Sequence, residues 1–161
     1  MGTWEGSGQS SEWRTPAYIF DALGCEFDLD VAHPAPGNGV SHVPCRRFIS
    51  ADSLTQPWQG FIWMNPPFGG RNGLEPWLER FFEHGNGIAL TPDRTSAPWW
   101  QAAAAQAESI LFTAGKVRFL RPDGSEGKQP GNGTSLWAAG RAARDALRMA
   151  ERNGLGCKVI P

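Results

Sequence analysis

The 161-residue sequence lacks several features that would place it in particular classes of protein. No apolar run approaches about 18 residues, so no transmembrane helix is expected. The three cysteines, Cys25, Cys45 and Cys157, form no CxxC pair, and an odd, scattered set is more typical of a reducing compartment than of a disulfide scaffold. The formal net charge is −1, which excludes a globally basic nucleic-acid binder and leaves only a local basic face for such a partner.

Two further absences concern targeting and metals. Residues 1–8 contain neither the basic region nor the apolar core of a signal peptide, so we expect the protein to stay in the cytoplasm. His33, His42 and Cys45 follow the spacing H-x8-H-x2-C, which lacks a clear fourth zinc ligand even though Cys25 is available. We therefore predict no metal site.

What the sequence does contain indicates one α/β domain. Its length is sufficient for a single domain with a substantial core. Residues 1–11, rich in Gly and Ser, are expected to form a flexible N-terminus, and no linker divides residues 12–161. Hydrophobic spacing predicts helices that alternate with strands, which favours a mostly parallel sheet. The helices are expected at residues 16–23, 74–84, 97–107 and 141–152.

The expected strands depart from simple alternation at two places. Residues 117–120 and 134–138 could pair as a late antiparallel hairpin across the loop 122–133. The short span between Asp30 and Asp52 hardly accommodates a strand–helix–strand crossover, so the sheet could lack an element between its first strands. The strands are expected at residues 27–31, 46–50, 61–64, 87–91, 109–113, 117–120, 134–138 and 157–160.

The stretch FIWMNPPF at residues 61–68 carries the clearest functional signal. Four large apolar residues predict a buried strand, and two prolines stiffen the loop at its carboxyl end. The side-chain carbonyl of Asn65 and the backbone carbonyl of Pro66 can accept both hydrogens of an amino group, and the ring of Phe68 can stack on the heterocycle that carries it. This predicts a site for a planar, amino-bearing substrate such as adenine. Alternatively, Asn65 only forms a turn and Phe68 only packs in the core.

Asn65-Pro66-Pro67-Phe68 after an apolar strand resembles the catalytic motif of S-adenosylmethionine-dependent amino-methyltransferases, which modify adenine N6 or cytosine N4. The blocks EWRTP (12–16), FDLDVA (27–32), LTPDRT (90–95) and GNGTSLW (131–137) look like those of the small phage-type DNA N-6-adenine methyltransferases (Dam-like). The resemblance implies a compact Rossmann-like methyltransferase domain and an adenine-specific, site-specific DNA-methyltransferase. It also implies S-adenosylmethionine as cofactor, DNA as partner, and a location in a bacterial cell or phage-infected host.

The same resemblance assigns further residues to the methyl donor. The segment with Trp13, Thr15 and Pro16 would close over the methionine end of the donor. Its helix N-terminus, with Thr15 as N-cap and Pro16 as first helical residue, would favour a carboxylate. Asp30 resembles the acidic end of the first strand beside the donor, and Ala32 begins the loop that follows, which lacks a GxG pattern. Asp52 would pair with the donor's adenine amino group; alternatively, it is a solvated turn carboxylate.

The sequence allows alternatives for the role of the basic residues and for the group that accepts the methyl. The residues expected at a DNA-facing edge are Arg71, Arg94, Lys116 and Arg118, together with Arg121 and Lys128. Alternatively, these residues are scattered solvated charges. The chain is too short for a separate recognition domain, which predicts low or short sequence specificity, or help from a second subunit in a homodimer. Cytosine N4, RNA adenine and a protein glutamine are alternative acceptors, and a non-catalytic nucleic-acid-binding relic is the alternative from another class.

Overall fold

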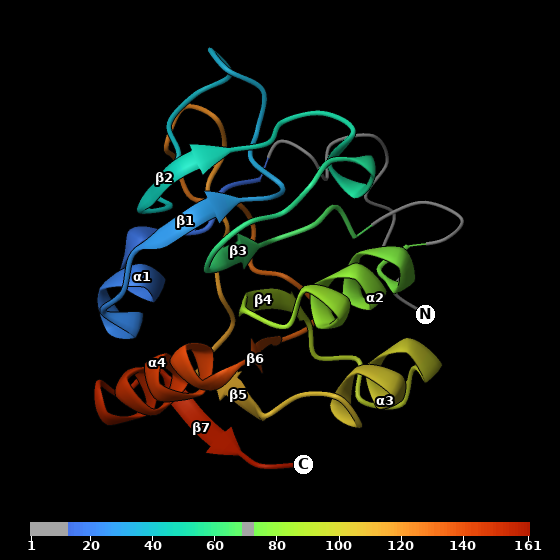
Figure 1. Cartoon of the computed structure of the whole chain (residues 1–161). Coiled ribbons are helices and arrows are strands. Elements are labelled where there is room, and N and C mark those ends of the chain that lie inside the picture. Colours follow the sequence, from blue (N-terminus) through green and yellow to red (C-terminus); the bar gives the residue numbers. More distant parts are fainter. Residues whose placement is uncertain (1–12, 69–72) are drawn as a thin grey trace.

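A computed structural model describes residues 13–68 and 73–161 of the protein (Figure 1). The predicted flexible segment 1–11 and the predicted DNA-binding residue Arg71 lie outside this part. The helices are α1 (Ala17–Leu23), α2 (Glu75–His84), α3 (Pro98–Ala104) and α4 (Arg141–Arg152). The strands are β1 (Phe27–Asp30), β2 (Cys45–Phe48), β3 (Ile62–Met64), β4 (Gly87–Pro92), β5 (Ser109–Thr113), β6 (Thr134–Ala139) and β7 (Gly156–Val159). No helix in the described residues is long and apolar enough to cross a membrane.

The strands form one seven-stranded sheet in the order β2-β1-β3-β4-β6-β5-β7. The pairs β1–β2, β1–β3 and β3–β4 are parallel, and the pairs β4–β6, β5–β6 and β5–β7 are antiparallel. This confirms the predicted α/β fold, with parallel pairing in the first half and an antiparallel C-terminal part. The predicted missing element is also confirmed, because residues 31–44 between β1 and β2 contain turns and no helix.

Helices cover both faces of the sheet (Figure 1). Side chains of α1 and α4 pack with Trp63, Ile88 and Leu90 in one core cluster. Side chains of α2 and α3 pack with Ile62 and Ala89 in the other. Neighbouring residues of β3 and β4 thus point to opposite faces, as the pleat of a strand requires. Burial of each such large apolar side chain stabilises the fold by about 1.5–3 kcal/mol.

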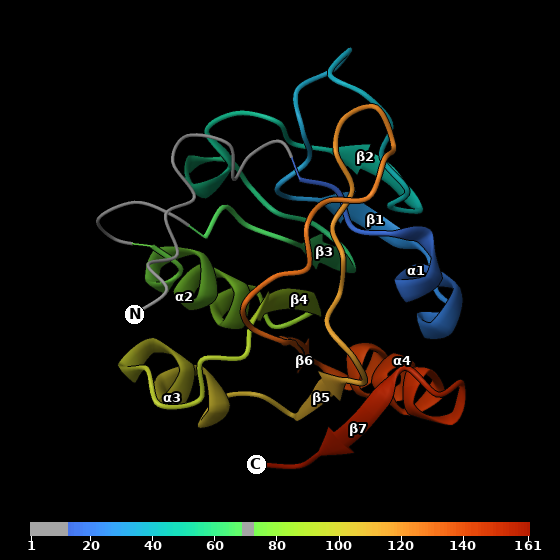
Figure 2. The same cartoon turned by 180° about the vertical axis from the view of Figure 1, so that it is seen from behind.

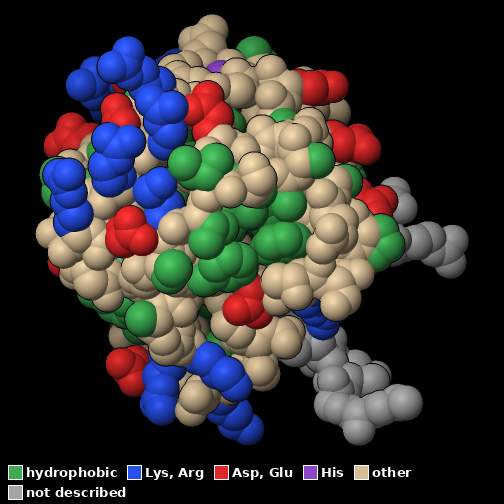
Figure 3. All heavy atoms as spheres, turned by 90° about the horizontal axis from the view of Figure 1, so that it is seen from below, with side chains coloured by type: hydrophobic (Ala, Val, Ile, Leu, Met, Phe, Trp, Pro, Cys, Tyr) green, Lys and Arg blue, Asp and Glu red, His purple; other side chains and the backbone are tan. Residues whose placement is uncertain are grey.

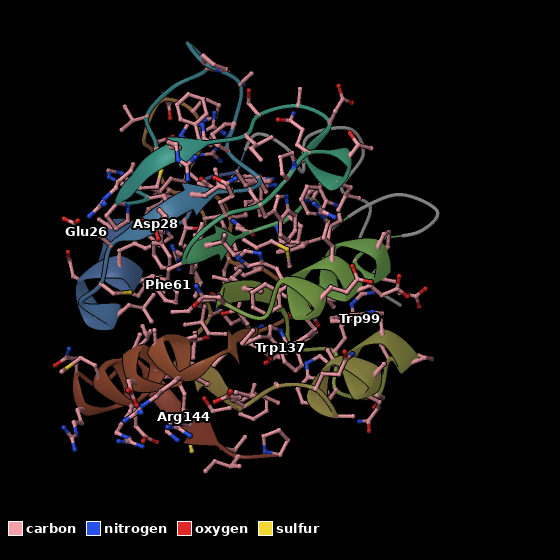
Figure 4. The ribbon with its side chains drawn as sticks, viewed as in Figure 1. Glu26, Asp28, Phe61, Trp99, Trp137 and Arg144 are labelled. Carbon is pink, nitrogen blue, oxygen red and sulfur yellow. The ribbon has the colours of Figure 1, made fainter. Side chains whose placement is uncertain are left out.

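A hydrogen bond between β1 and the start of β3 fixes the strand that carries the Asn-Pro-Pro-Phe motif. The backbone N–H of Phe61 donates to Asp28 Oδ2 at 2.8 Å, and Figure 4 shows these two residues close together. Gly60, with φ 78°, lies against the Asp28 carboxylate, where a side chain would collide with it. Asp30 then pairs with Trp63, so the chain beyond β3 leaves the sheet next to the carboxyl end of β1.

Two local predictions are wrong. Residues 117–120 form no strand and do not pair with β6, whose neighbours are β4 and β5. In the long segment between β5 and β6, Leu120 makes isolated bridges to Arg14 and Glu126, because this segment leaves the sheet and crosses toward the N-terminal segment (Figure 2). Thr15 is not the N-cap of α1: Pro16 occupies that position, and the Thr15 hydroxyl contacts Asn65 instead.

Candidate active site

A cavity of about 1130 Å³ opens at the carboxyl ends of β1 and β3. The chain continues from β1 to β2 on one side, whereas β3 lies on the other side of β1. In open α/β sheets such a point of divergence is where ligands bind. The segments that line the cavity are residues 13–15, 30–35, 49–55, 65–68 and 128–131, with further side chains between them.

The predicted acceptor motif forms one wall of this cavity. Asn65, Pro66, Pro67 and Phe68 all line it, with Pro66 buried and the other three half-buried. The Asn65 side-chain amide donates from Nδ2 to Thr15 Oγ1 at 3.1 Å. The Phe68 ring meets the Phe119 ring edge to face, with centroids 6.4 Å apart. Phe68 also packs against both core clusters, so it combines the predicted cavity position with partial core packing.

Asp30 and Ala32 line the cavity at the end of β1, the strand next to β3. The Asp30 carboxyl is buried, with 2% of the residue exposed, and accepts the backbone N–H of Ala32 at 3.1 Å. Burial raises the pKa of Asp30 from 3.8 to about 7, although the hydrogen bond from Ala32 opposes this shift. A buried carboxyl with so little compensation favours a ligand that carries positive charge.

Asp52 lies at the rim of the cavity, before the 3-10 turn Ser53–Thr55. Its φ of 51° is the single positive value among the described non-glycine residues. Asp tolerates this left-handed conformation better than most residues, and the Asp52 carbonyl accepts the N–H and the hydroxyl of Thr55 at 3.0 and 2.8 Å. The residue is exposed, as the turn-carboxylate alternative requires, and it also faces the predicted donor site.

The N-terminal segment supplies another part of the wall. Of the three residues predicted to bind the donor here, Trp13 and Thr15 line the cavity, whereas Pro16 is buried and does not. Arg14, which our predicted site residues omitted, also lines the cavity; it is only 3% exposed and its guanidinium donates to the carbonyl of Asn38. The signal in the sequence that could have identified Arg14 was its position between Trp13 and Thr15, which were both predicted site residues. The backbones of Arg14 and Leu120 bond reciprocally at 2.9 and 2.8 Å.

Phe119 is a second cavity residue that sequence reasoning did not assign to the site. It belongs to the segment that was expected to form a strand. Val117 enters the core, with 1% exposed, while Phe119 meets Phe68 at the cavity. The alternation of apolar residues in this segment was visible in the sequence. These residues, however, pack against the core and the cavity and do not join the sheet.

The predicted basic residues fall into two groups. Arg94, Lys116 and Arg118 are exposed and do not line the cavity, and Arg118 lies 3.7 Å from Glu126. Arg121 and Lys128 are exposed and do line it. The exposed cations of the described cavity lining therefore come from the segment between β5 and β6, whereas the buried Arg14 comes from the N-terminal segment.

Helix α4 carries a separate group of cations. Figure 3 shows Lys and Arg side chains gathered on the side of the molecule where α4 lies. Two of its arginines have acidic neighbours, since Arg144 lies 3.8 Å from Glu108 and Arg148 lies 4.0 Å from Asp145. Figure 4 shows Arg144 on the outer side of α4, whereas Trp137 lies within the molecule. None of these arginines lines the cavity, so the group is separate from the candidate site.

The histidine and cysteine pattern gives no metal centre in the described residues. The His33 ring stacks on Phe48 at 4.2 Å between centroids, and its Nδ1 lies 2.7 Å from the carbonyl of Pro34. Among residues 13–68 and 73–161, no three His, Cys, Asp or Glu side chains gather as metal ligands would. His33 lines the cavity as an aromatic wall residue.

Comparison with known proteins now bears on this arrangement. A family model described as DNA N-6-adenine-methyltransferase (Dam) matches residues 6–152, most of the chain. Comparisons with curated proteins and with solved structures gave no match. The family match spans every segment that lines the cavity, from Trp13 to Gly131. The chain therefore belongs to the DNA N-6-adenine-methyltransferase (Dam) family.

Proposed function

We propose that the protein transfers a methyl group from S-adenosylmethionine to N6 of adenine in DNA, and that it does so in the cavity at the carboxyl ends of β1 and β3. One observation carries this proposal. The amino-accepting motif Asn65–Phe68 and the buried carboxyl of Asp30 line the same cavity, at the divergence point of the sheet. A substrate amine and a positively charged donor would thus meet there.

The residues of the cavity fit such a donor. S-adenosylmethionine, when bound, supplies a methyl group on a positively charged sulfur, which makes the methyl group reactive without acid catalysis. Asp30 offers a buried carboxyl to that positive charge, and Ala32 lies beside it. Asp52, an exposed residue of the cavity lining, would accept the donor's adenine amino group. Trp13 and the backbone at Thr15 would enclose the donor, while Pro16 fixes the backbone where α1 begins.

On the acceptor side, the chain orients the amine. The Asn65 and Pro66 carbonyls accept the two N6 hydrogens, so the nitrogen lone pair is directed toward the donor. Pro67 keeps this loop stiff, and Phe68 stacks on the adenine ring. As N6 gains the methyl group it becomes positively charged, and the two carbonyl oxygens stabilise that charge. The N6 proton then leaves to water.

DNA must bring its target base out of the helical stack to reach this cavity. Arg121 and Lys128 line the cavity and would contact phosphates near it. Arg71, Arg94, Lys116 and Arg118 remain predicted contacts along a wider DNA path. The small number of segments around the cavity favours low or short sequence specificity, or a homodimer in which a second subunit adds DNA contacts.

The decisive experiment offers labelled S-adenosylmethionine with duplex DNA, single-stranded DNA and RNA, and analyses the nucleosides by mass spectrometry. We expect N6-methyladenine in DNA. Finding N4-methylcytosine, or N6-methyladenine in RNA alone, would support the alternative acceptors, and methylation of protein alone would support a glutamine acceptor. No methylation, together with no binding of S-adenosylhomocysteine in calorimetry, would support the non-catalytic relic.

A further inference from the structure

We infer that Thr15 is a positioning residue for Asn65: its hydroxyl holds the Asn65 amide with Nδ2 turned away from the substrate and the carbonyl oxygen left for the target amine. This inference rests on the proposed function and deepens it. The resemblance assigns the segment of Thr15 to the donor, whereas the structure shows its side chain against the acceptor motif. The carrying observation is the hydrogen bond from Asn65 Nδ2 to Thr15 Oγ1, at 3.1 Å.

An asparagine amide needs such a partner to be useful here. Its terminal torsion has two nearly equivalent orientations, one with the oxygen and one with the nitrogen toward a given neighbour. Only the oxygen can accept a hydrogen of the target amine, while the NH₂ group would oppose it with another donor. In the structure the Thr15 hydroxyl accepts from Nδ2, so the Asn65 amide stands in the productive orientation, with its oxygen left for the target amine.

Thr15 is itself held firmly enough to do this. It is buried, with 4% exposed. On its N-terminal side, Arg14 and Leu120 exchange two backbone hydrogen bonds. On its C-terminal side, Pro16 has a fixed φ, and its carbonyl accepts the N–H of Ile19 at the start of α1. The β-branched side chain of Thr15 also has few rotamers, so its hydroxyl position is well defined.

The test compares Thr15→Val, which keeps the shape and removes the hydroxyl, with Thr15→Ser, which keeps the hydroxyl. We expect Thr15→Val to lower kcat for DNA methylation by about tenfold, while the Kd for S-adenosylhomocysteine stays within about twofold. Thr15→Ser should restore most of kcat. Thr113→Val is the matched control, because Thr113 hydrogen-bonds to Thr134 at 2.8 Å and does not line the cavity. It should leave kcat unchanged.

A second readout does not depend on methyl transfer. The side-chain NH₂ resonances of Asn65, assigned by their loss in Asn65→Ala, should show slow hydrogen exchange with water in the wild type and in Thr15→Ser. They should shift and exchange faster in Thr15→Val. An unchanged kcat in Thr15→Val, a parallel loss of donor affinity, or unchanged Asn65 resonances would each overturn the positioning role. Failure of the proposed function would be seen separately, as a wild-type protein that methylates no adenine.

Discussion

The two walls of the cavity are built in different ways. The acceptor wall is a short loop with two prolines, and it leaves β3, whose three residues are all buried. The wall that we propose for the donor consists largely of residues 31–35 and 49–55, which are loops, turns and a short 3-10 helix before and after the edge strand β2 in the sequence. One wall follows directly from a buried strand, whereas the other is formed by loop segments that enter the core only at single residues such as Val31 and Ile49.

This difference indicates where each wall draws its stability. The acceptor loop is anchored through core residues such as Trp63 and Met64, at 1% and 0% exposed. The donor loops are held by bonds such as that from Arg14 to the Asn38 carbonyl and from His33 N–H to the carbonyl of Ile49. We therefore expect substitutions on the acceptor wall to affect catalysis selectively, and substitutions on the donor wall to affect stability and donor affinity together.

The largest expected effect is that of Asn65→Ala. Loss of one positioned group that stabilises developing charge lowers rates by about a hundredfold to a thousandfold. We expect kcat for DNA methylation to fall by at least about a hundredfold. The Kd for S-adenosylhomocysteine, measured by calorimetry, should remain within about twofold of the wild type. A comparable loss of donor affinity would show that the two walls are not independent.

Asp30→Asn tests the donor wall through pH. Because the folded pKa is raised to about 7 from 3.8, the folded protein holds a proton that the unfolded chain releases in this range. The free energy of unfolding should thus fall as pH rises from about 4 to 7, by up to about 1.4 kcal/mol for each pH unit. The amide that replaces the carboxyl in Asp30→Asn does not titrate, so the variant should lack this dependence.

Urea unfolding of both proteins measures this difference. The stability gain of Asp30→Asn over the wild type should be small near pH 4 and greatest at pH 8. The asparagine oxygen can still accept the Ala32 N–H, so that contact is retained. Donor affinity at pH 8 should fall in the variant. A gain that does not change with pH would contradict the assigned proton.

Phe68→Ala tests the stacking surface. Stacking of a base on an aromatic ring contributes about 1–3 kcal/mol, so we expect the KM for DNA to rise by about tenfold. Phe68→Leu is the matched control, since it keeps an apolar side chain against the core and removes the aromatic face. If Phe68→Leu behaves like the wild type, core packing and not stacking explains the residue.

The smallest effects are expected for the cations. Lys128 lines the cavity and Lys116 does not, although both are exposed, so they form a matched pair. We expect Lys128→Ala to reduce the slope of log affinity for DNA against log salt by about 1, and Lys116→Ala to change it less. Fluorescence anisotropy over a range of salt concentrations measures both slopes. A larger effect of Lys116→Ala would indicate that DNA follows the edge predicted from the sequence.

The helices and strands that the local sequence pattern specifies were predictable. Helix α2 has apolar residues at helical spacing and ends at Gly85 in a left-handed conformation, and β3 with its two prolines was evident from residues 61–67 alone. Non-local contacts were not predictable. Leu120 looked like a strand residue, but its partner is Arg14, far away along the chain. Thr15 had the pattern of an N-cap, and a tertiary contact with Asn65 took its hydroxyl.

The same dependence on non-local contacts limited the prediction of which basic residues line the cavity. Lys128 and Lys116 each follow a glycine in the sequence, and the path of the segment between β5 and β6 decides which of them lines the cavity. Arg14 shows a related limit, because the sequence around a charged residue does not reveal that its side chain is buried. Prediction from sequence therefore located the acceptor motif better than the residues that support it.

The two edges of the sheet bear on how copies of this protein can associate. Both edge strands, β2 and β7, have only four residues, and β2 exposes Arg46 and Arg47 while β7 carries Lys158. Short, charged edges are poor templates for the addition of a further strand, and they oppose aggregation through backbone pairing. Any dimer is thus expected to form through side-chain surfaces and not by extension of the sheet from one copy into the next.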